Sequence, residues 1–205
     1  MIRVLVVDDS AVVRTILQRE LSAEHDIEVV GVAEDAYDAR EKILRLAPDV
    51  VTLDVEMPRM NGIDFLERLM MYHPVPVVIF SSVTAPNSET ALHALSLGAV
   101  EVVAKPAAGS DAKAVMQQLV RGVRAAAAAN LGHEPDDRAD STPAMPSLNA
   151  ALRARIRQNV IAVGASTGGP AAIERLLAAM PAGSPPILIV QHMPAGFTDA
   201  FARRL

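Results

Sequence analysis

Residues 50–62 read VVTLDVEMPRMNG, an apolar run that ends in an acid and gives way to a loop with a proline and a glycine. Unbroken runs of apolar, β-branched residues are typical of parallel strands that are covered on both faces. Four similar runs occur along the chain, and segments with helical spacing of apolar residues separate them. They are residues 2–7, 27–32, 75–80 and 99–104. The alternation predicts an α/β fold with a doubly wound parallel sheet of five strands.

The composition argues against a nucleic-acid-binding protein, a disulfide-bonded protein and a membrane-spanning protein. The 205-residue chain has a net charge of −5, which gives no electrostatic case for nucleic acid as the main partner. It contains no cysteine, which excludes disulfides and thiol catalysis and agrees with a reducing cytoplasm. The sequence has no run of about 20 apolar residues that could span a bilayer. We therefore expect a cytoplasmic protein with no nucleic-acid partner and no membrane insertion.

A change of composition divides the chain. An amphipathic helix around residues 115–123 is expected to close the first domain, and the next 22 or so residues, 130–151, are rich in proline, glycine and aspartate, as in a solvated linker. New apolar strands are expected at residues 160–163 and 187–191, with a helix between them. We predict a first domain over residues 1–128, a linker over 129–157, and the start of a second, Rossmann-like α/β domain over 158–205.

Acidic residues stand where two of the predicted strands end. Asp8 and Asp9 follow the first strand and Asp54 follows the third, and the carboxyl ends of parallel strands share one edge of a sheet. Three carboxylates repel one another unless a cation joins them, and Mg²⁺ prefers such hard oxygen ligands. Asp is also common after strands because it starts turns and caps helices. Ser81 and Lys105 at the next two strand ends favour the metal site, because a hydroxyl and an ammonium suit a phosphoryl group.

Over about residues 1–125 the chain resembles the receiver domain of two-component response regulators. The resemblance rests on the Asp8-Asp9 pair, the segment 54–62, Ser81 and the Lys105-Pro106 pair. It implies a flavodoxin-like strand order, 2-1-3-4-5. It also implies that Asp54 accepts a phosphoryl group from the phosphohistidine of a sensor kinase. Mg²⁺ is then held by Asp8, Asp9, Asp54 and the backbone carbonyl of Glu56, while Ser81 and Lys105 contact the phosphoryl oxygens.

One position departs from the receiver pattern. Receivers often carry an aromatic switch residue three positions before the lysine, whereas this chain has Val102. Without a large ring to rotate, we expect movement of Ser81 and its loop to carry more of the signal.

A second group of candidate residues lies after the predicted linker. Residues 164–170 read GASTGGP, a turn that either binds phosphate through backbone N–H groups or presents Ser166 as a nucleophile. His192 ends the next predicted strand, on the same edge of the sheet as Ser166. A histidine at a strand end is often structural, but beside a serine it favours catalysis, because a hydroxyl needs an adjacent base at neutral pH.

The phrases GASTGGP and QHMP, downstream of a receiver, resemble the chemotaxis response-regulator protein-glutamate methylesterases. The resemblance implies that Ser166 is the nucleophile and His192 the general base of a serine hydrolase that needs no cofactor for the ester chemistry. The substrates are glutamate γ-methyl esters on chemoreceptors, with deamidation of glutamines as a related activity. The partners are a chemotaxis histidine kinase and methylated chemoreceptors, and the unphosphorylated receiver blocks the active site.

The sequence also raises doubts about this hydrolase. The family uses an Asp far downstream to orient the histidine, and Asp199, within the next expected helix, is the only acid after His192. We therefore expect a truncated catalytic domain, a competent receiver and a poor esterase. Two alternatives stay open: a response regulator with a non-catalytic binding output, and a nucleotide-binding α/β enzyme that uses the glycine-rich turn.

Overall fold

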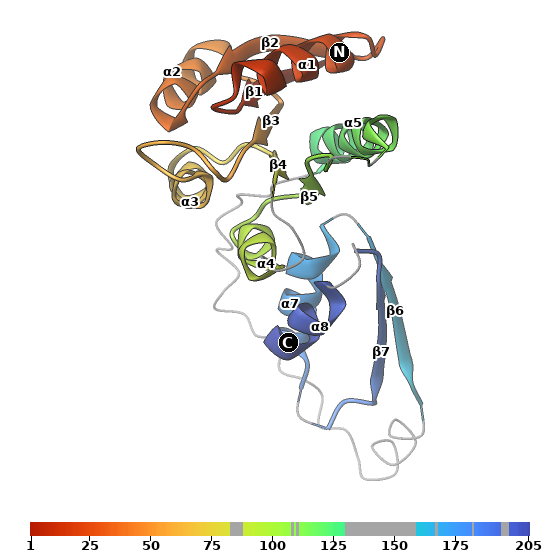
Figure 1. Cartoon of the computed structure of the whole chain (residues 1–205). Coiled ribbons are helices and arrows are strands. Elements are labelled where there is room, and N and C mark those ends of the chain that lie inside the picture. Colours follow the sequence, from red (N-terminus) through yellow and green to blue (C-terminus); the bar gives the residue numbers. More distant parts are fainter. Residues whose placement is uncertain are drawn as a thin grey trace.

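The computed structural model describes residues 1–82, 88–107, 109, 111–129, 159–166, 168–181, 183–193 and 197–205. Most of the predicted linker, residues 130–157, lies outside the described residues. The first part of the molecule alternates strands and helices (Figure 1). In chain order these are β1 (Ile2–Val7), α1 (Ala11–Ser22), β2 (Ile27–Ala33), α2 (Ala36–Leu46), β3 (Val50–Leu53), α3 (Gly62–Tyr72), β4 (Val77–Ser81), α4 (Ser88–Ser96), β5 (Glu101–Ala104) and α5 (Ala112–Ala128).

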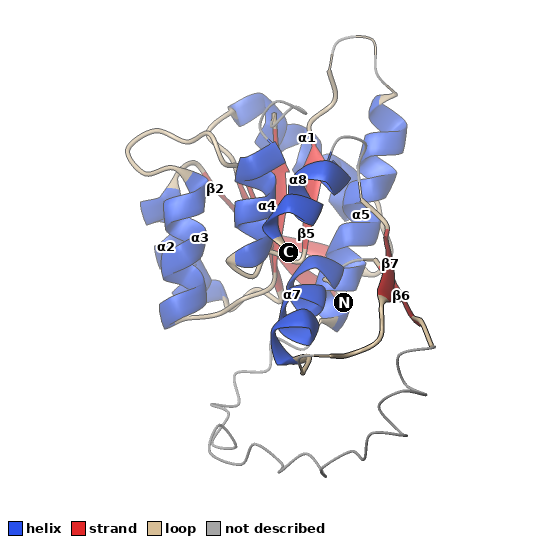
Figure 2. Ribbon diagram, turned by 90° about the horizontal axis from the view of Figure 1, so that it is seen from below, coloured by secondary structure: helices blue, strands red, loops and turns tan. Residues whose placement is uncertain are grey.

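The five strands form one parallel sheet in the order β2-β1-β3-β4-β5. One buried cluster joins the sheet to α2, α3 and α4, and another joins it to α1 and α5 (Figure 2). All four residues of β3 are buried, as the unbroken apolar run at its position requires. The predicted doubly wound, flavodoxin-like sheet is confirmed.

Short polar side chains cap the N-termini of several of these helices. Ser10 accepts a hydrogen bond from the backbone N–H of Val13 and so caps α1. Asp35, Asn61 and Asp111 do the same for α2, α3 and α5. Each cap satisfies N–H groups that the first helical turn leaves without a partner.

The strand bounds differ from the prediction where the backbone cannot join the ladder. The predicted strand 75–80 is β4, which starts only at Val77 because Pro74 and Pro76 have no N–H to donate. The predicted strand 99–104 is β5 and starts at Glu101, since Gly98 turns the chain with a φ of 106°. The strand predicted to end at residue 32 extends one residue further as β2.

The second part contains β6 (Ile161–Ala165), α7 (Gly169–Ala179), β7 (Ile187–Gln191) and α8 (Phe197–Arg204). Its two strands pair in parallel, and β6 extends two residues beyond the predicted 160–163. Helices α7 and α8 pack against α4 (Figure 1). Their buried residues Ile173 and Phe201 belong to the same buried cluster as the core under α2–α4. Among the described helices, none combines the length and the apolar character that a membrane span requires.

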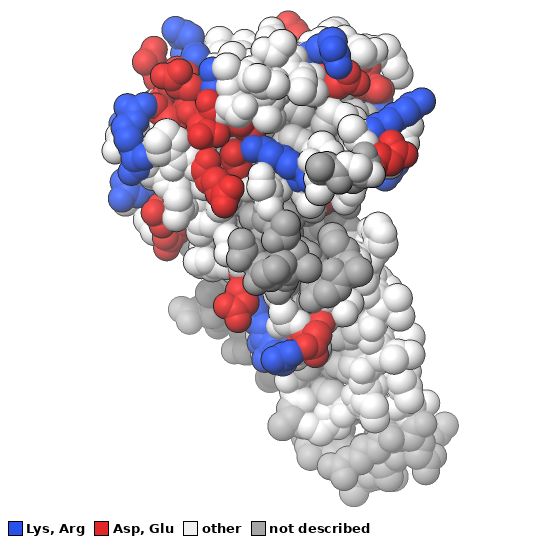
Figure 3. Space-filling model, viewed as in Figure 1, with Lys and Arg blue, Asp and Glu red and all other residues white. Residues whose placement is uncertain are grey.

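Charged side chains are distributed unevenly between the two parts. On the face shown in Figure 3, acidic and basic residues gather over the first part, whereas the surface over β6 and β7 is nearly free of them. Neither strand contains a charged residue.

Candidate phosphoacceptor and serine sites

The acidic residues meet at the carboxyl edge of the first sheet. Asp8 directly follows β1, and the N–H of Asp54, directly after β3, donates to the carbonyl of Val7 at 2.9 Å. One carboxylate oxygen from each of Asp8, Asp9 and Asp54 lies within 4.8 Å of the others. Asp8 and Asp54 are buried, while Asp9 is exposed. The three side chains therefore form one acidic site that is open to solvent on one side.

Lys105 extends into this acidic site from the end of β5. Its Nζ donates to Oδ2 of Asp54 at 2.5 Å and lies 2.8 Å from Oδ2 of Asp8, an ion-pair contact without the alignment of a hydrogen bond. Burial alone favours the neutral amine, but the carboxylates of Asp54 and Asp8 outweigh it and raise the pKa of Lys105. Burial also raises the pKa of Asp8, against the opposing effect of Lys105. The lysine therefore stays charged in the site.

Ser81 completes the polar edge. It ends β4, is fully buried, and its Oγ has no hydrogen-bond partner among the described residues. The backbone ties it to the lysine, because the N–H of Lys105 donates to the carbonyl of Ser81 at 2.8 Å. A buried hydroxyl without a partner costs free energy, and a phosphoryl oxygen at this edge would satisfy it.

The loop after Asp54 is held on both sides. The N–H of Glu56 donates to Oδ1 of Asp54 at 3.2 Å. At Gly62 an added Cβ would lie 2.0 Å from the carbonyl oxygen of Asp54, so only glycine lets α3 start this close to the site. Arg59, which has a φ of 70°, pairs with the buried carboxylate of Asp35. The sequence analysis missed this ion pair, because nothing in the spacing of two residues from different loops predicts it.

The second group of candidate residues lies at the corresponding edge of the second sheet. Ala165 and Gln191 are register partners at the ends of β6 and β7, so Ser166 and His192 are the next residues on neighbouring strands. Both are exposed, and both line one cavity of about 510 Å³. The structure therefore brings the predicted serine and histidine to one site. Among the described residues, no hydrogen bond joins their side chains.

Gln191 holds the two loops of this serine site together. Its Nε2 donates to the carbonyl of Ser166 at 2.8 Å and to that of His192 at 2.7 Å. The N–H of His192 in turn donates to the carbonyl of Ala165 at 2.9 Å. The sequence analysis did not single out Gln191, although its place before His192 at a strand end was a usable signal. Asp199 pairs with Arg203 on its own helix, in agreement with its expected unsuitability as an orienting acid.

The first domain forms the opposite wall of the serine cavity. Val100, Val102 and Arg121 line it together with Ser166 and His192. The N–H of Gly168, two residues after Ser166, donates to the carbonyl of Val100 at 3.2 Å. The next N–H, that of Gly169, donates to the carbonyl of Ser166 at 2.8 Å. These donors of the glycine-rich turn are therefore engaged within the protein, which disfavours the nucleotide-binding alternative.

The chain matches two known families in the regions that hold the two sites. Residues 4–117 match the response regulator receiver domain, and residues 161–205 match CheB methylesterase. The chain is 51% identical to a protein-glutamate methylesterase/protein-glutamine glutaminase of Anaeromyxobacter dehalogenans, over all of this chain and 56% of that protein. It spans a little over half of the length of the curated relatives that it matches, 56–59% for three of them.

Solved structures agree with the receiver match. The response regulator domain of Thermotoga maritima CheB is 39% identical and superposes with a TM-score of 0.59, over 63% of this chain and 98% of that chain. A chain of the CheX-CheY-BeF3-Mg²⁺ complex from Borrelia burgdorferi is 28% identical, with a TM-score of 0.51 over 58% of this chain and 87% of that chain.

Proposed function

The chain belongs to the response-regulator receiver family, and on that premise we propose a phosphorylation-controlled protein-glutamate methylesterase and glutamine deamidase of bacterial chemotaxis. The receiver takes in residues 1–128 and the catalytic part residues 158–205, with 129–157 as the linker. The observation that carries the proposal is the wall that the receiver contributes to the cavity of Ser166 and His192. A regulatory domain and a candidate nucleophile thus share one site.

The first reaction takes place at Asp54. A carboxylate oxygen of Asp54 attacks the phosphorus of a phosphohistidine on the partner kinase; the new O–P bond forms as the N–P bond breaks, and the imidazole leaves. Lys105, already within 2.5 Å of this carboxylate, is placed to pair with a phosphoryl oxygen. The unpartnered Oγ of Ser81 donates to another.

The donor set of this site fits Mg²⁺. Three carboxylates face one ammonium, so the site holds excess negative charge, and the three oxygens are close enough for one small cation. Asp8, Asp9 and Asp54 would hold the ion, together with the backbone carbonyl of Glu56. When bound, Mg²⁺ neutralises the charge that develops on the phosphoryl oxygens.

The second reaction takes place at Ser166. His192 accepts the proton of the hydroxyl as Oγ attacks the carbonyl carbon of a glutamate γ-methyl ester, and it returns the proton to the methoxide, which leaves as methanol. Water then hydrolyses the acyl-enzyme by the same proton route in reverse order. Gln191 positions both loops through their carbonyls, and the ester chemistry needs no cofactor.

The receiver controls this reaction by contact. The carbonyl of Val100 accepts a hydrogen bond from the N–H of Gly168 beside the nucleophile, and Val102 of β5, the strand that starts directly after Val100, lines the same cavity. Phosphorylation at Asp54 acts through Ser81, the last residue of β4, and Lys105, the residue directly after β5, and withdraws this wall. Val102 therefore acts by its position in the wall and not by rotation of a ring.

The proposed partners follow from the two reactions. The phosphoryl donor is a chemotaxis histidine kinase, and the ester substrates are the methylated helices of chemoreceptors. Both reactions take place in the cytoplasm, because the kinase obtains its phosphoryl group from ATP there.

Methanol release from methylated receptor tests the proposal on the gene product, with and without a small-molecule phosphodonor. We expect release to rise with the donor and Mg²⁺, to vanish in Ser166→Ala, and to lose only its donor response in Asp54→Asn. Unchanged release by Ser166→Ala would refute the assignment of the nucleophile. Binding of NAD or ATP at micromolar concentration would instead support the nucleotide alternative.

A further inference from the structure

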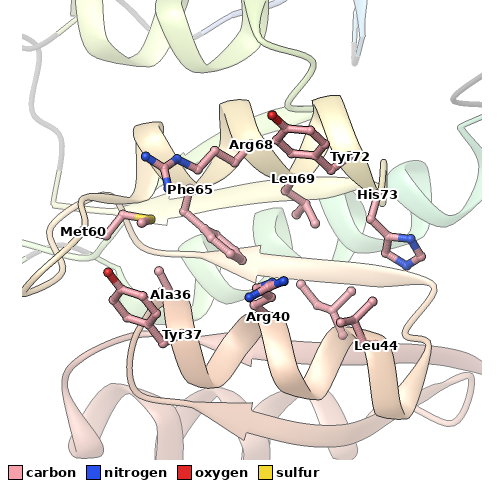
Figure 4. Close-up of a pocket in the computed structure, with 11 residues that line it drawn as sticks. Ala36, Tyr37, Arg40, Leu44, Met60, Phe65, Arg68, Leu69, Tyr72 and His73 are labelled. Atoms are coloured by element: carbon pink, nitrogen blue, oxygen red, sulfur yellow. The ribbon is translucent and has the colours of Figure 1, made fainter.

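A groove between α2 and α3 belongs to neither of the two sites. It has a volume of about 390 Å³ and runs along both helices, from Met60 and Tyr37 at one end to His73 at the other (Figure 4). The stretch from Ala36 to Leu44 alone covers nine residues of α2, or ~12 Å along the helix axis at the helical rise. The shape is therefore an open, elongated groove.

The groove has an apolar floor and an exposed apolar rim. Ile43, Phe65 and Leu69 form the floor and are buried in the core of the receiver. At the rim, Tyr37, Leu44 and Tyr72 are 56%, 62% and 79% exposed. Covering apolar surface stabilises a complex by about 25 cal/mol per Å², and such rims often mark binding surfaces.

The charge of the groove is opposite to that of the chain. The net charge of the protein is −5, yet the side chains that line the groove include Arg40, Arg68 and His73 and no acid. Within the described residues the side chain of neither Arg40 nor Arg68 makes a hydrogen bond or an ion pair, whereas that of Arg45 on α2 pairs with Glu41. Two arginines without partners beside an apolar floor make a site for carboxylates.

We propose that this groove binds an acidic peptide segment of a partner protein. An apolar side chain of the peptide enters between Phe65 and Leu69, and its carboxylates pair with Arg40 and Arg68. A groove between two parallel-running helix faces suits a helical turn or a short extended segment, and its open length disfavours a compact small molecule. The positive charge of the groove does not by itself separate an acidic peptide from nucleic acid or anionic lipid. Both are therefore included as competitors in the experiment below.

The groove stays accessible while the receiver contacts the serine site. Helices α2 and α3 lie on the side of the receiver away from β6 and β7, and α7 and α8 pack on α4 (Figure 1). Docking in the groove therefore leaves the wall of the serine cavity in place. The groove also adjoins the loop after Asp54, because Met60 lines it and Arg59 stacks over the ring of Tyr37 at 5.6 Å.

A peptide library tests the proposal without a known partner. Random twelve-residue peptides on phage are panned against the whole 205-residue chain, and selected peptides are synthesised for affinity measurement. We expect the selected peptides to combine Asp or Glu with a Leu, Phe or Trp anchor. The double variant Arg40→Gln/Arg68→Gln should weaken their binding at least about tenfold. The matched control Arg19→Gln/Arg45→Gln removes two exposed arginines outside the groove and should leave binding unchanged.

Tyrosine emission locates the bound peptide. The chain contains no Trp and two Tyr, and both tyrosines line the groove, so their emission should change when a Trp-free peptide binds. Unaltered circular dichroism and thermal midpoint establish that the double variant is folded. The proposal is overturned if no peptide is enriched, if the enriched peptides are basic, if both double variants bind equally, or if tyrosine emission does not respond. Stronger competition by an oligonucleotide or by anionic vesicles than by the selected peptides overturns it too.

Discussion

At the scale of residues, the candidate phosphoacceptor site contains more negative than positive charge. Asp8, Asp9 and Asp54 gather around one ammonium, that of Lys105, and two of the three carboxylates are buried. The lysine stabilises these carboxylates while no phosphoryl group is present, and it also competes with a metal ion for their oxygens. Its two effects can be separated by substitution.

Lys105→Met should tighten Mg²⁺ binding by at least about tenfold, because it removes a positive charge beside the ligands, worth a few kcal/mol at an effective dielectric constant of ~20. Phosphoryl uptake by Asp54 should fall at the same time, since the group that pairs with the phosphoryl oxygen is gone. Calorimetric titration with MgCl₂ and labelling with a phosphodonor measure the two effects. Lys42→Met, which removes a lysine paired with Asp38 on α2, serves as the control and should change neither. Weaker Mg²⁺ binding in Lys105→Met would contradict this account of the site.

The sequence predicted which residues meet at the two candidate sites better than it predicted the side chains that hold those residues in place. Carboxylates, a hydroxyl and an ammonium that directly follow apolar strand sequences can be recognised in the sequence. The carboxyl ends of parallel strands lie at one edge of the sheet, so these groups are expected to lie together. The ion pair of Arg59 with Asp35 and the bridging amide of Gln191 depend on side-chain directions in loops. Those directions are set by packing that becomes apparent only in three dimensions.

At the scale of elements, α5 is fastened to the start of the sheet by an ion-pair cluster. Arg124 on α5 donates to Asp26 at 2.7 and 2.9 Å and to Glu24 at 2.7 Å, in the turn between α1 and β2. The hydrogen bonds from Arg124 lower the pKa of Asp26 from 3.8 to about 2. A half-buried cluster of this kind near the surface contributes modestly to stability, and its contribution depends on pH.

Arg124→Met should destabilise the fold at neutral pH but not in strong acid. Because the pKa of Asp26 is lower in the folded state, the contribution is complete above the unfolded pKa near 3.8 and is lost as the pH falls through about 2. Urea midpoints of parent and variant, measured from pH 7 to pH 2, should converge over that interval. Arg19→Met, which disrupts a solvent-exposed pair with Glu20, should show no comparable convergence. A gap between parent and Arg124→Met that persists at pH 2 would show that the ion pair is not its cause.

The order and type of the elements were predictable from the sequence, and their ends were less so. Apolar runs and helical stripes gave all five receiver strands in the correct order, since the family pattern supplied the topology. The predicted starts of β4 and β5 were wrong by two residues each, because the residues before Val77 and Glu101 are apolar and resemble a strand sequence. Prolines before Val77 and the turn at Gly98 keep these residues out of the hydrogen-bonded sheet. The linker predicted over residues 129–157 stays a prediction.

At the scale of the whole molecule, the receiver and the serine site are joined by packing as well as by the cavity. Phe201 of α8 is 4% exposed and Ile173 of α7 is 2% exposed, and both belong to the core cluster of the receiver. The N–H of Gly168 and the carbonyl of Val100 add a hydrogen bond across the same contact. No periodicity in the sequence predicts a contact between the two parts of the chain. Only the family resemblance implied it, through the expectation that the unphosphorylated receiver blocks the active site.

Phe201→Ala should weaken the contact between α8 and α4 by about 3 kcal/mol, the usual cost of removing a buried aromatic side chain. We expect the amide of Gly168 to exchange its hydrogen faster in this variant without any phosphodonor. Leu176→Ala, on the exposed side of α7, is the matched control and should leave that rate unchanged. Equal exchange rates in Phe201→Ala and the parent would mean that α8 does not hold the receiver in place.

The most direct test of the central claim, that phosphorylation at Asp54 controls the serine site, is hydrogen exchange at the amide of Gly168. In the parent chain with Mg²⁺, this amide should be protected by the carbonyl of Val100 and should lose its protection when a phosphodonor is added. In Asp54→Asn it should stay protected under both conditions. Exchange that does not respond to the donor in the parent, or that responds equally in Asp54→Asn, would contradict the claim.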